Sequence, residues 1–99
     1  MSQATSRNAV GPVIQAGDFA DAVVEAIRDD NPGKEVVVRT RASYVRIEVD
    51  GECTVRRETI QAKLGRPFRM SEMELNMSSF AGQIETGNDQ IRFFFDRAL

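Results

Sequence analysis

The side chains able to do chemistry in this sequence are carboxylates, basic groups and one thiol. The chain has 15 Asp and Glu, 13 Lys and Arg, no His and a single cysteine, Cys53. Without imidazole, one thiolate offers no ligand set for zinc, copper, haem or an iron–sulfur cluster. The same count excludes a Ser–His or Cys–His nucleophile pair and a histidine base. We therefore expect no transition metal in this chain and no covalent acyl-transfer chemistry.

The acidic side chains do not match known carboxylate sites either. Glu25, Asp29 and Asp30 lack the spaced oxygen ligands and the central glycine of a calcium loop, so we interpret them as the solvated end of a helix. A paired-carboxylate enzyme would need a cleft, which a domain with one small core seldom provides. The glycines form no G-x-G-x-x-G or phosphate loop, and we interpret them as turn residues.

Basic side chains surround the only tyrosine, Tyr44. They are Arg39, Arg41, Arg46, Arg56 and Arg57. A solvated charged sheet face is our first interpretation and a protein-binding surface the second. Nucleic acid is the third, because bases stack on neighbouring aromatic side chains and only Tyr44 is available here. The net charge of −2 adds no general attraction to phosphate.

Length and hydrophobicity place the chain among small globular proteins. It has 99 residues, of which 41% are hydrophobic, enough for one modest core. We expect a flexible tail over residues 1–9 and a single domain over residues 10–99. The apolar runs are too short for a signal peptide or a membrane span, and one cysteine fits a reducing compartment. These features predict a cytoplasmic protein that does not bind a membrane.

Hydrophobic periodicity predicts the elements that must position any functional side chain. A helix begins at Asp18, whose carboxylate is expected to cap it, and ends at Asn31-Pro32-Gly33. The remaining elements are a second helix over 58–64, a brief turn at 71–74, and strands at 13–14, 35–41, 43–49, 52–57, 80–85 and 90–96. The order β-α-β-β-β-α-turn-β-β predicts an α+β fold, an antiparallel sheet system with two helices.

Two strand registers can also be argued from the sequence. A three-residue loop with Gly51 in left-handed geometry would pair the strands 43–49 and 52–57, with Ile47 opposite Cys53. Cys53 would then be a small core side chain rather than a reactive thiol. In the last strand Ile91, Phe93 and Phe95 alternate inward. Phe94 points the other way, where it either packs under the helices, our preferred reading, or stands exposed as an anchor for a partner.

Several short strings together point to a family. They are Asn31-Pro32-Gly33-Lys34-Glu35, Tyr44-Val45-Arg46-Ile47, Gly51-Glu52, Leu64-Gly65-Arg66-Pro67-Phe68, Ser79-Phe80-Ala81-Gly82-Gln83-Ile84 and Asp89-Gln90-Ile91-Arg92-Phe93. In this order and spacing, from Val10 to Arg97, they resemble the effector (coupling) proteins of bacterial multicomponent diiron monooxygenases. The likeness is nearest to the toluene monooxygenase effectors, with phenol hydroxylase and methane monooxygenase regulatory proteins as more distant relatives.

The resemblance implies a non-catalytic, cofactor-free protein. Its partner would be the diiron hydroxylase of an aromatic-hydrocarbon monooxygenase, in a system that also contains ferredoxin and reductase components. By similarity, the hydroxylase-binding residues would be Asn76, Met77, Ser78, Ser79, Phe80, Gly82 and Gln83, with Asn31, Tyr44 and Arg69 as additional contacts. The alternatives are a small α+β ligand- or nucleic-acid-binding module and, least favoured, an enzyme acting through carboxylates alone.

Overall fold

The computed structural model describes residues 8–95, and the predicted tail falls mainly on residues outside this range. The helices are α1 (Asp18–Asp30), α2 (Arg57–Leu64) and α3 (Met70–Asn76). The strands are β1 (Ala9–Gln15), β2 (Val36–Thr40), β3 (Tyr44–Asp50), β4 (Glu52–Arg56), β5 (Met77–Ala81), β6 (Gln83–Thr86) and β7 (Gln90–Phe94).

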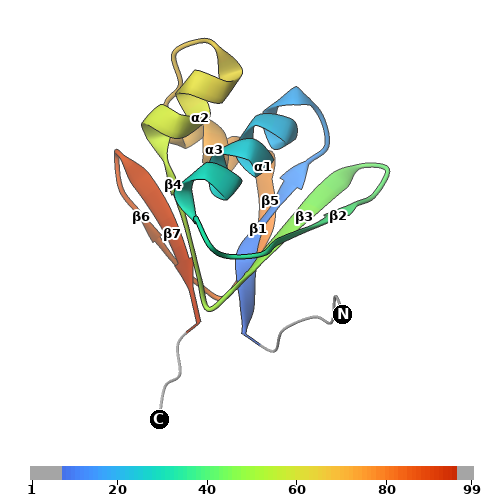
Figure 1. Cartoon of the computed structure of the whole chain (residues 1–99). Coiled ribbons are helices and arrows are strands. Elements are labelled where there is room, and N and C mark those ends of the chain that lie inside the picture. Colours follow the sequence, from blue (N-terminus) through green and yellow to red (C-terminus); the bar gives the residue numbers. More distant parts are fainter. Residues whose placement is uncertain (1–7, 96–99) are drawn as a thin grey trace.

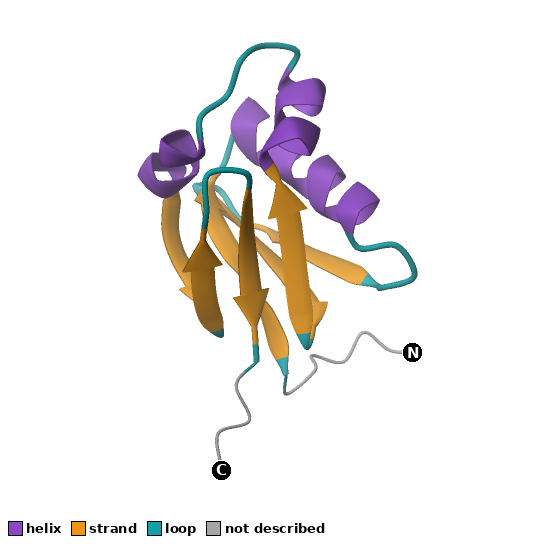
Figure 2. Ribbon diagram, turned by 90° about the vertical axis from the view of Figure 1, so that its left-hand side faces the viewer, coloured by secondary structure: helices purple, strands orange, loops and turns teal. Residues whose placement is uncertain are grey.

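These strands form two antiparallel sheets. The larger sheet has the order β2-β3-β1-β5 and the smaller one the order β4-β7-β6. The sheets converge where β3 passes into β4 and diverge toward the helices, so the fold has the shape of a V (Figure 1). Figure 2 shows the helices gathered at the open end of the strands. The α+β prediction is therefore confirmed in its class and in its antiparallel sheets.

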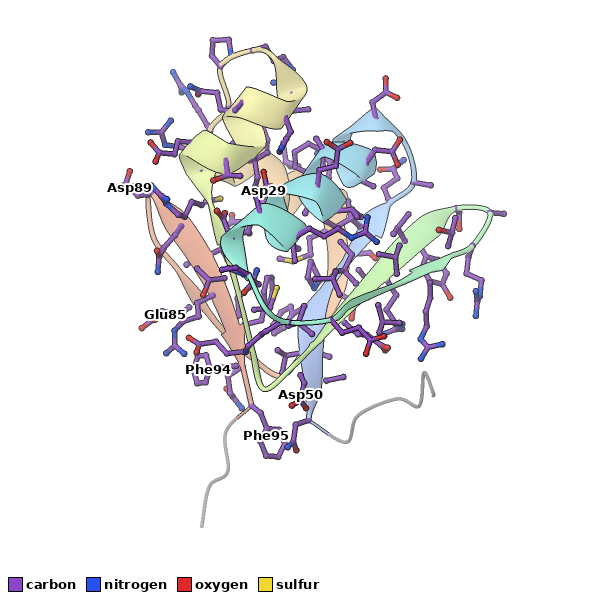
Figure 3. All side chains as sticks on the ribbon, in the orientation of Figure 1. Asp29, Asp50, Glu85, Asp89, Phe94 and Phe95 are labelled. Carbon is purple, nitrogen blue, oxygen red and sulfur yellow. The ribbon has the colours of Figure 1, made fainter. Side chains whose placement is uncertain are left out.

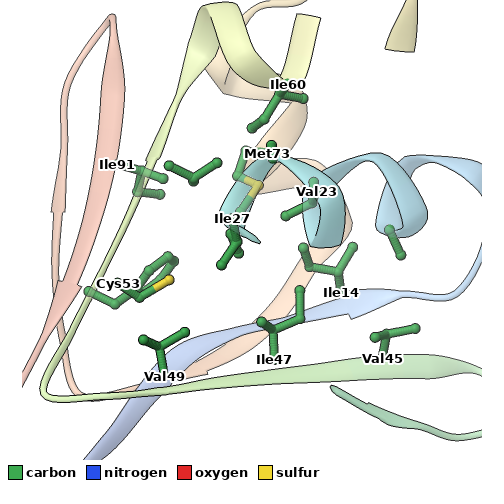
Figure 4. Packing of buried hydrophobic residues seen from close by; sticks show 14 of the residues in the cluster. Ile14, Val23, Ile27, Val45, Ile47, Val49, Cys53, Ile60, Met73 and Ile91 are labelled. Atoms are coloured by element: carbon green, nitrogen blue, oxygen red, sulfur yellow. The ribbon is translucent and has the colours of Figure 1, made fainter. Parts of the chain in front are cut away.

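The core fills the space between the two sheets and under α1. Val23 and Ile27, four residues apart on α1, are both fully buried against inward side chains of the sheets (Figure 4). The expected core positions Ile47, Cys53 and Phe93 are at most 1% exposed. Each large apolar side chain buried in this way contributes about 1.5 to 3 kcal/mol to folding.

Residues 8–95 form three helices rather than the two we predicted, because the expected turn at 71–74 is part of α3. Met70 and Met73, three residues apart, both point into the core, and this burial stabilises a short helix that periodicity alone left ambiguous. The helix begins at Met70, directly after its capping residue Arg69, so it starts one residue before the predicted turn. For α1, Gly17 rather than Asp18 is the capping residue.

The predicted hairpin between β3 and β4 does not form. Gly51 does adopt positive φ, at 80°, but the chain passes there from one sheet into the other. Cys53 consequently pairs with Phe93 of β7 rather than with Ile47. The inward pattern of both strands was correct, because both face the same core, but alternation does not say which strand lies alongside which.

The strand predictions need four further corrections. β1 begins at Ala9 rather than Val13, and the expected strand 80–85 is divided into β5 and β6 at Gly82. Phe95, expected to point inward, follows the end of β7 and is 41% exposed beside Asp50, where the sheets converge (Figure 3). Phe94 lies half-buried on the outer face of the smaller sheet under the Arg92 guanidinium, 4.0 Å from its ring centroid, rather than under the helices.

Candidate functional site

Four of the ten sequence-predicted contact residues, Met77, Ser78, Ser79 and Phe80, lie on β5, an edge strand of the larger sheet, and Asn76, Gly82 and Gln83 flank it. Within the part of the chain that the structure describes, β5 pairs only with β1. The register shifts between Val13 and Ile14, which leaves Ser78 at a bulge. Met77 packs against the core, whereas Ser78, Ser79 and Phe80 are exposed. Edge strands present backbone groups and side chains to a neighbour, so β5, like the other edge strands β2, β4 and β6, is in a position to meet another protein.

Phe80 of β5 packs its side chain against the smaller sheet and so connects the two sheets at this edge. It pairs with Pro12 of β1, and its ring centroid lies 6.0 Å from that of the buried Phe93. The side chain is nevertheless 39% exposed. One face of the ring therefore contributes to the core while the rest remains available for contact with a partner.

Gly82 carries the chain from β5 into β6 and hence between the sheets. Its φ is 92°, and a Cβ atom here would lie 2.6 Å from Val10 Cγ1 and 2.7 Å from the Phe94 carbonyl oxygen. Only glycine fits this position without displacing neighbours. Gly82 therefore acts by fixing the path of β5, while Gln83 beyond it is exposed.

A second group of candidates meets at the α3 end of the same strand. Here the last residues of β1, the start of β3 and the α3–β5 junction line a shallow hollow: Gln15, Ser43, Tyr44, Leu75, Asn76 and Ser78. The structure thus brings Tyr44 together with Asn76 and Ser78, although Tyr44 is more than thirty positions away in the chain. The Asn76 side-chain amide donates to the Glu72 carbonyl oxygen at 2.8 Å, which fixes the rim of the hollow.

The sequence did not predict three residues of this hollow, Gln15, Ser43 and Leu75, of which Leu75 is the apolar one. Its side chain is 84% exposed, more than any other large apolar side chain among residues 8–95. From the sequence alone, Leu75 would be interpreted as a core residue, because it lies among the apolar residues Met70, Met73 and Met77. Only the direction of α3, set by the burial of Met70 and Met73, shows that Leu75 points away from the core.

Two of the predicted contact residues lie elsewhere. Asn31 is 8% exposed at the end of α1, and its amide is used internally. Nδ2 donates to the carbonyl oxygens of Ile27 (2.7 Å) and Thr54 (2.8 Å), and Oδ1 accepts from the Thr54 N–H (3.0 Å). Arg69 is exposed but borders a different hollow, formed with α2 and the β6–β7 turn. The structure gives Asn31 a role in joining α1 to β4.

The arginines do not form one basic face. Arg39 and Arg46 pair on the larger sheet, where Arg39 also binds the Glu48 carboxylate at 3.0 Å. Arg56 of β4 pairs with Glu58 of α2, and Arg57 of α2 pairs with Asp89 of the β6–β7 turn. A basic surface of the kind that tracks a phosphate backbone therefore does not arise from these residues.

Cys53 is a buried core residue. It is fully buried, and this burial raises the pKa of its thiol to about 12, with Lys34 opposing the shift. The thiolate, which is the reactive form, is therefore negligible near neutral pH. Among residues 8–95 no cluster of His, Cys, Asp or Glu is arranged to hold a metal ion, and no helix is long and apolar enough to cross a membrane.

Comparison with known proteins decides the family. The sequence profile of the MmoB/DmpM family matches residues 8–94, which include every candidate residue described above. The chain belongs to the MmoB/DmpM family. This is a family of effector subunits of multicomponent monooxygenases, so the chain is a regulatory rather than a catalytic component.

Two curated relatives are similar along most of the chain. The effector subunit of the alkene monooxygenase system of Xanthobacter autotrophicus Py2 is 46% identical, over 96% of this chain and 98% of the relative. The stimulatory component DmpM of phenol 2-monooxygenase from Pseudomonas sp. CF600 is 36% identical, over 77% of this chain and 82% of the relative. The effector resemblance is therefore confirmed, but its assignment to the toluene enzymes is not.

Solved structures show the same fold. A chain in a structure of the phenol hydroxylase–regulatory protein complex is 27% identical, with a TM-score of 0.76 over 91% of this chain and 100% of that one. The regulatory protein B of soluble methane monooxygenase has a TM-score of 0.67 at 24% identity, over 98% of this chain and 71% of that one. The second likeness supports the fold alone.

Proposed function

We propose that this chain is the effector protein of a multicomponent diiron monooxygenase, where it binds the hydroxylase component and regulates its turnover, coupling and product selectivity. The observation that carries the proposal is the family match over residues 8–94, together with relatives that are an effector subunit and a stimulatory component. The similar fold of a chain in a phenol hydroxylase–regulatory protein complex supports the choice of partner. Electron-transfer components, a ferredoxin and a reductase, would complete such a system in the cytoplasm.

An effector without a cofactor acts through differential affinity. It must bind one conformation of the hydroxylase more tightly than another, because a protein that binds both equally shifts nothing. A coupling of about 1 to 3 kcal/mol changes the populations about 5- to 150-fold. The exposed side chains of β5 and the hollow beside it are the surfaces of this chain that we propose for that contact.

We propose an alkene as the substrate class of the partner, because the alkene-system effector is more similar than the phenol-system component, at 46% against 36% identity. An aromatic hydrocarbon, the class expected from the sequence, is the second candidate, since the phenol relative still matches 77% of this chain. Both effectors would use the same fold, so the substrate class follows from which hydroxylase this chain fits.

Reconstitution tests both parts of the proposal. The chain is added to the hydroxylase and electron-transfer components of the Xanthobacter alkene system and, separately, to those of the Pseudomonas phenol system. We expect the initial rate of alkene oxidation to rise at least several-fold and saturably, and the phenol rate to rise less. A larger effect on phenol would reverse the substrate class, and no effect on either rate would contradict the effector function.

The β5 surface is tested by Ser79→Arg. Ser79 is exposed, and its side chain makes no hydrogen bond within residues 8–95. The arginine should therefore leave the fold unchanged and place a large charged side chain in the proposed interface. We expect the concentration of effector needed for half-maximal stimulation to rise roughly tenfold or more, as for loss of a central interface contact. The matched control is Thr40→Arg at the end of β2, the opposite edge of the same sheet. Equal effects of the two substitutions would remove β5 from the interface.

A further inference from the structure

The exposure of Leu75 is unusual because of its surroundings. Isolated exposed leucines are common on protein surfaces and need no explanation. Leu75, however, is 84% exposed and stands at the rim of a hollow whose other members are Gln15, Ser43, Tyr44, Asn76 and Ser78. None of these side chains is charged, in a protein of which 28% of the residues are charged.

An uncharged surface around one apolar side chain has the composition of an interface centre. The buried centres of protein interfaces are depleted in charged residues and enriched in aromatic ones, here Tyr44. Polar but neutral groups also lose less free energy than ions when a partner removes their water. A partner can therefore cover this hollow and the Leu75 side chain without having to neutralise an ion inside it.

The hollow is also held in place before any partner arrives. Hydrogen bonds between backbone groups join Ala16 to Ser43 at 3.0 Å and Arg41 to Tyr44 at 2.8 Å, while the Asn76 amide is tied to α3. Leu75 itself lies on a helix whose Met70 and Met73 are anchored in the core. A rigid surface loses little conformational entropy on binding, so most of the contact free energy appears as affinity.

The hollow is continuous with the β5 surface. Ser78 belongs to both, because it lines the hollow and also lies at the bulge of the edge strand. A partner bound to Ser79 and Phe80 would therefore also contact Ser78 and, through the hollow that Ser78 lines, Leu75. This continuity selects one occupant for the hollow, the protein that binds β5.

We propose that Leu75 is the hydrophobic anchor of the hydroxylase interface, and that it inserts into an uncharged, apolar depression on the hydroxylase surface. This inference rests on the proposed function, because it names the residue that supplies much of the affinity for the same partner. Tyr44, Asn76 and Ser78 form the neutral ring that excludes water around the anchor, as is found around residues that dominate binding.

Truncation of the anchor tests the inference. Binding of the chain to the purified hydroxylase of the Xanthobacter alkene system is measured by calorimetry. We expect Leu75→Ala to raise Kd about 30-fold or more, the usual effect of losing a dominant contact. Leu75→Met keeps the volume and should stay within about threefold of the unsubstituted chain. Alanine and methionine are good helix formers, so α3 should remain intact, which circular dichroism verifies.

A labelling experiment asks whether Leu75 is covered, independently of affinity. Since Cys53 is buried and protonated, Leu75→Cys introduces the only reactive thiol of the chain. The matched control is Ala62→Cys, at an exposed position of α2. With saturating hydroxylase, we expect maleimide modification of this chain, followed by mass spectrometry, to slow at least tenfold at position 75 and to stay unchanged at position 62.

The outcomes separate the two proposals. If the unsubstituted chain does not bind the hydroxylase, the proposed function fails and the anchor fails with it. If the chain binds but Leu75→Ala has an unchanged Kd, or position 75 is labelled as fast in the complex as in the free protein, the effector function stands and the anchor is wrong.

Discussion

Replacing Gly11 with alanine is expected to destabilise the domain so strongly that little folded protein remains at 37 °C. Gly11 lies in β1, between β3 and β5, with φ of 144°. A Cβ atom there would lie 2.2 Å from the carbonyl oxygen of Ile47, which is backbone of the neighbouring strand and has no rotamer to change. Relief would require β1 and β3 to separate, at a cost of more than about 4 kcal/mol out of a total of about 5 to 15 kcal/mol.

Urea unfolding followed by circular dichroism measures this loss. The matched control is Gly87→Ala in the β6–β7 turn, where an added Cβ would meet only the Gln90 carbonyl oxygen, at an ordinary 3.5 Å. We expect the control to shift the free energy of unfolding by less than about 1 kcal/mol. Similar midpoints for Gly11→Ala and the unsubstituted protein would mean that β1 and β3 are not packed as closely as described.

Asn31→Ala is expected to lower the free energy of unfolding by about 2 to 4 kcal/mol, because it removes the amide that bonds both backbone groups of Thr54 in β4 and that adds a second donor to the Ile27 carbonyl oxygen of α1. The lost bonds are those of the Asn31 amide to the Ile27 carbonyl and to both backbone groups of Thr54. Asn31→Asp keeps an acceptor for the Thr54 N–H but removes both donors, so it should also destabilise the protein.

This prediction separates a structural role for Asn31 from the partner contact suggested by sequence similarity. The stability change is read from urea unfolding, and stimulation of the hydroxylase is measured with saturating, folded effector at low temperature. We expect near-normal maximal stimulation from Asn31→Ala and no stability change from Asn88→Ala, an exposed asparagine in the β6–β7 turn. Normal stability together with lost stimulation would instead place Asn31 in the interface.

The sequence predicted most elements and the side chains that face the core, because both follow from local periodicity. α1, α2 and the strands that became β2, β3, β4 and β7 lie within a few residues of their predicted positions. Gly51 takes the positive φ expected of it directly after β3. These features depend on contacts within one turn or one strand.

What the sequence did not predict depends on partners distant in the chain. The pairing of β4 with β7 rather than β3 is decided by the whole topology, since both arrangements bury Cys53 and Val55. The division of β5 from β6 at Gly82 results from the close approach of Val10 and Phe94. α3 forms because Met70 and Met73 are buried in the core, and the periodicity of the sequence alone does not show this burial.

The candidate site shows the same division. Family resemblance selected the β5 residues, and the structure places Tyr44 beside Asn76 and Ser78. The sequence could not reveal that Leu75 is exposed, because hydrophobic residues at helical spacing are normally interpreted as core. It also could not reveal that Asn31 is buried, since an asparagine before Pro-Gly is typical of an exposed turn.

The burial of the Cys53 thiol has a consequence for a protein that acts on a dioxygen-using enzyme. Peroxide attacks the ionised form of cysteine, and Cys53, the sole cysteine of the chain, is both protonated and out of reach. Met70 and Met73 are shielded in the same interior. Among residues 8–95 only Met77 has a partly exposed sulfur-containing side chain, so oxidant released by a neighbouring enzyme should damage this part of the chain slowly.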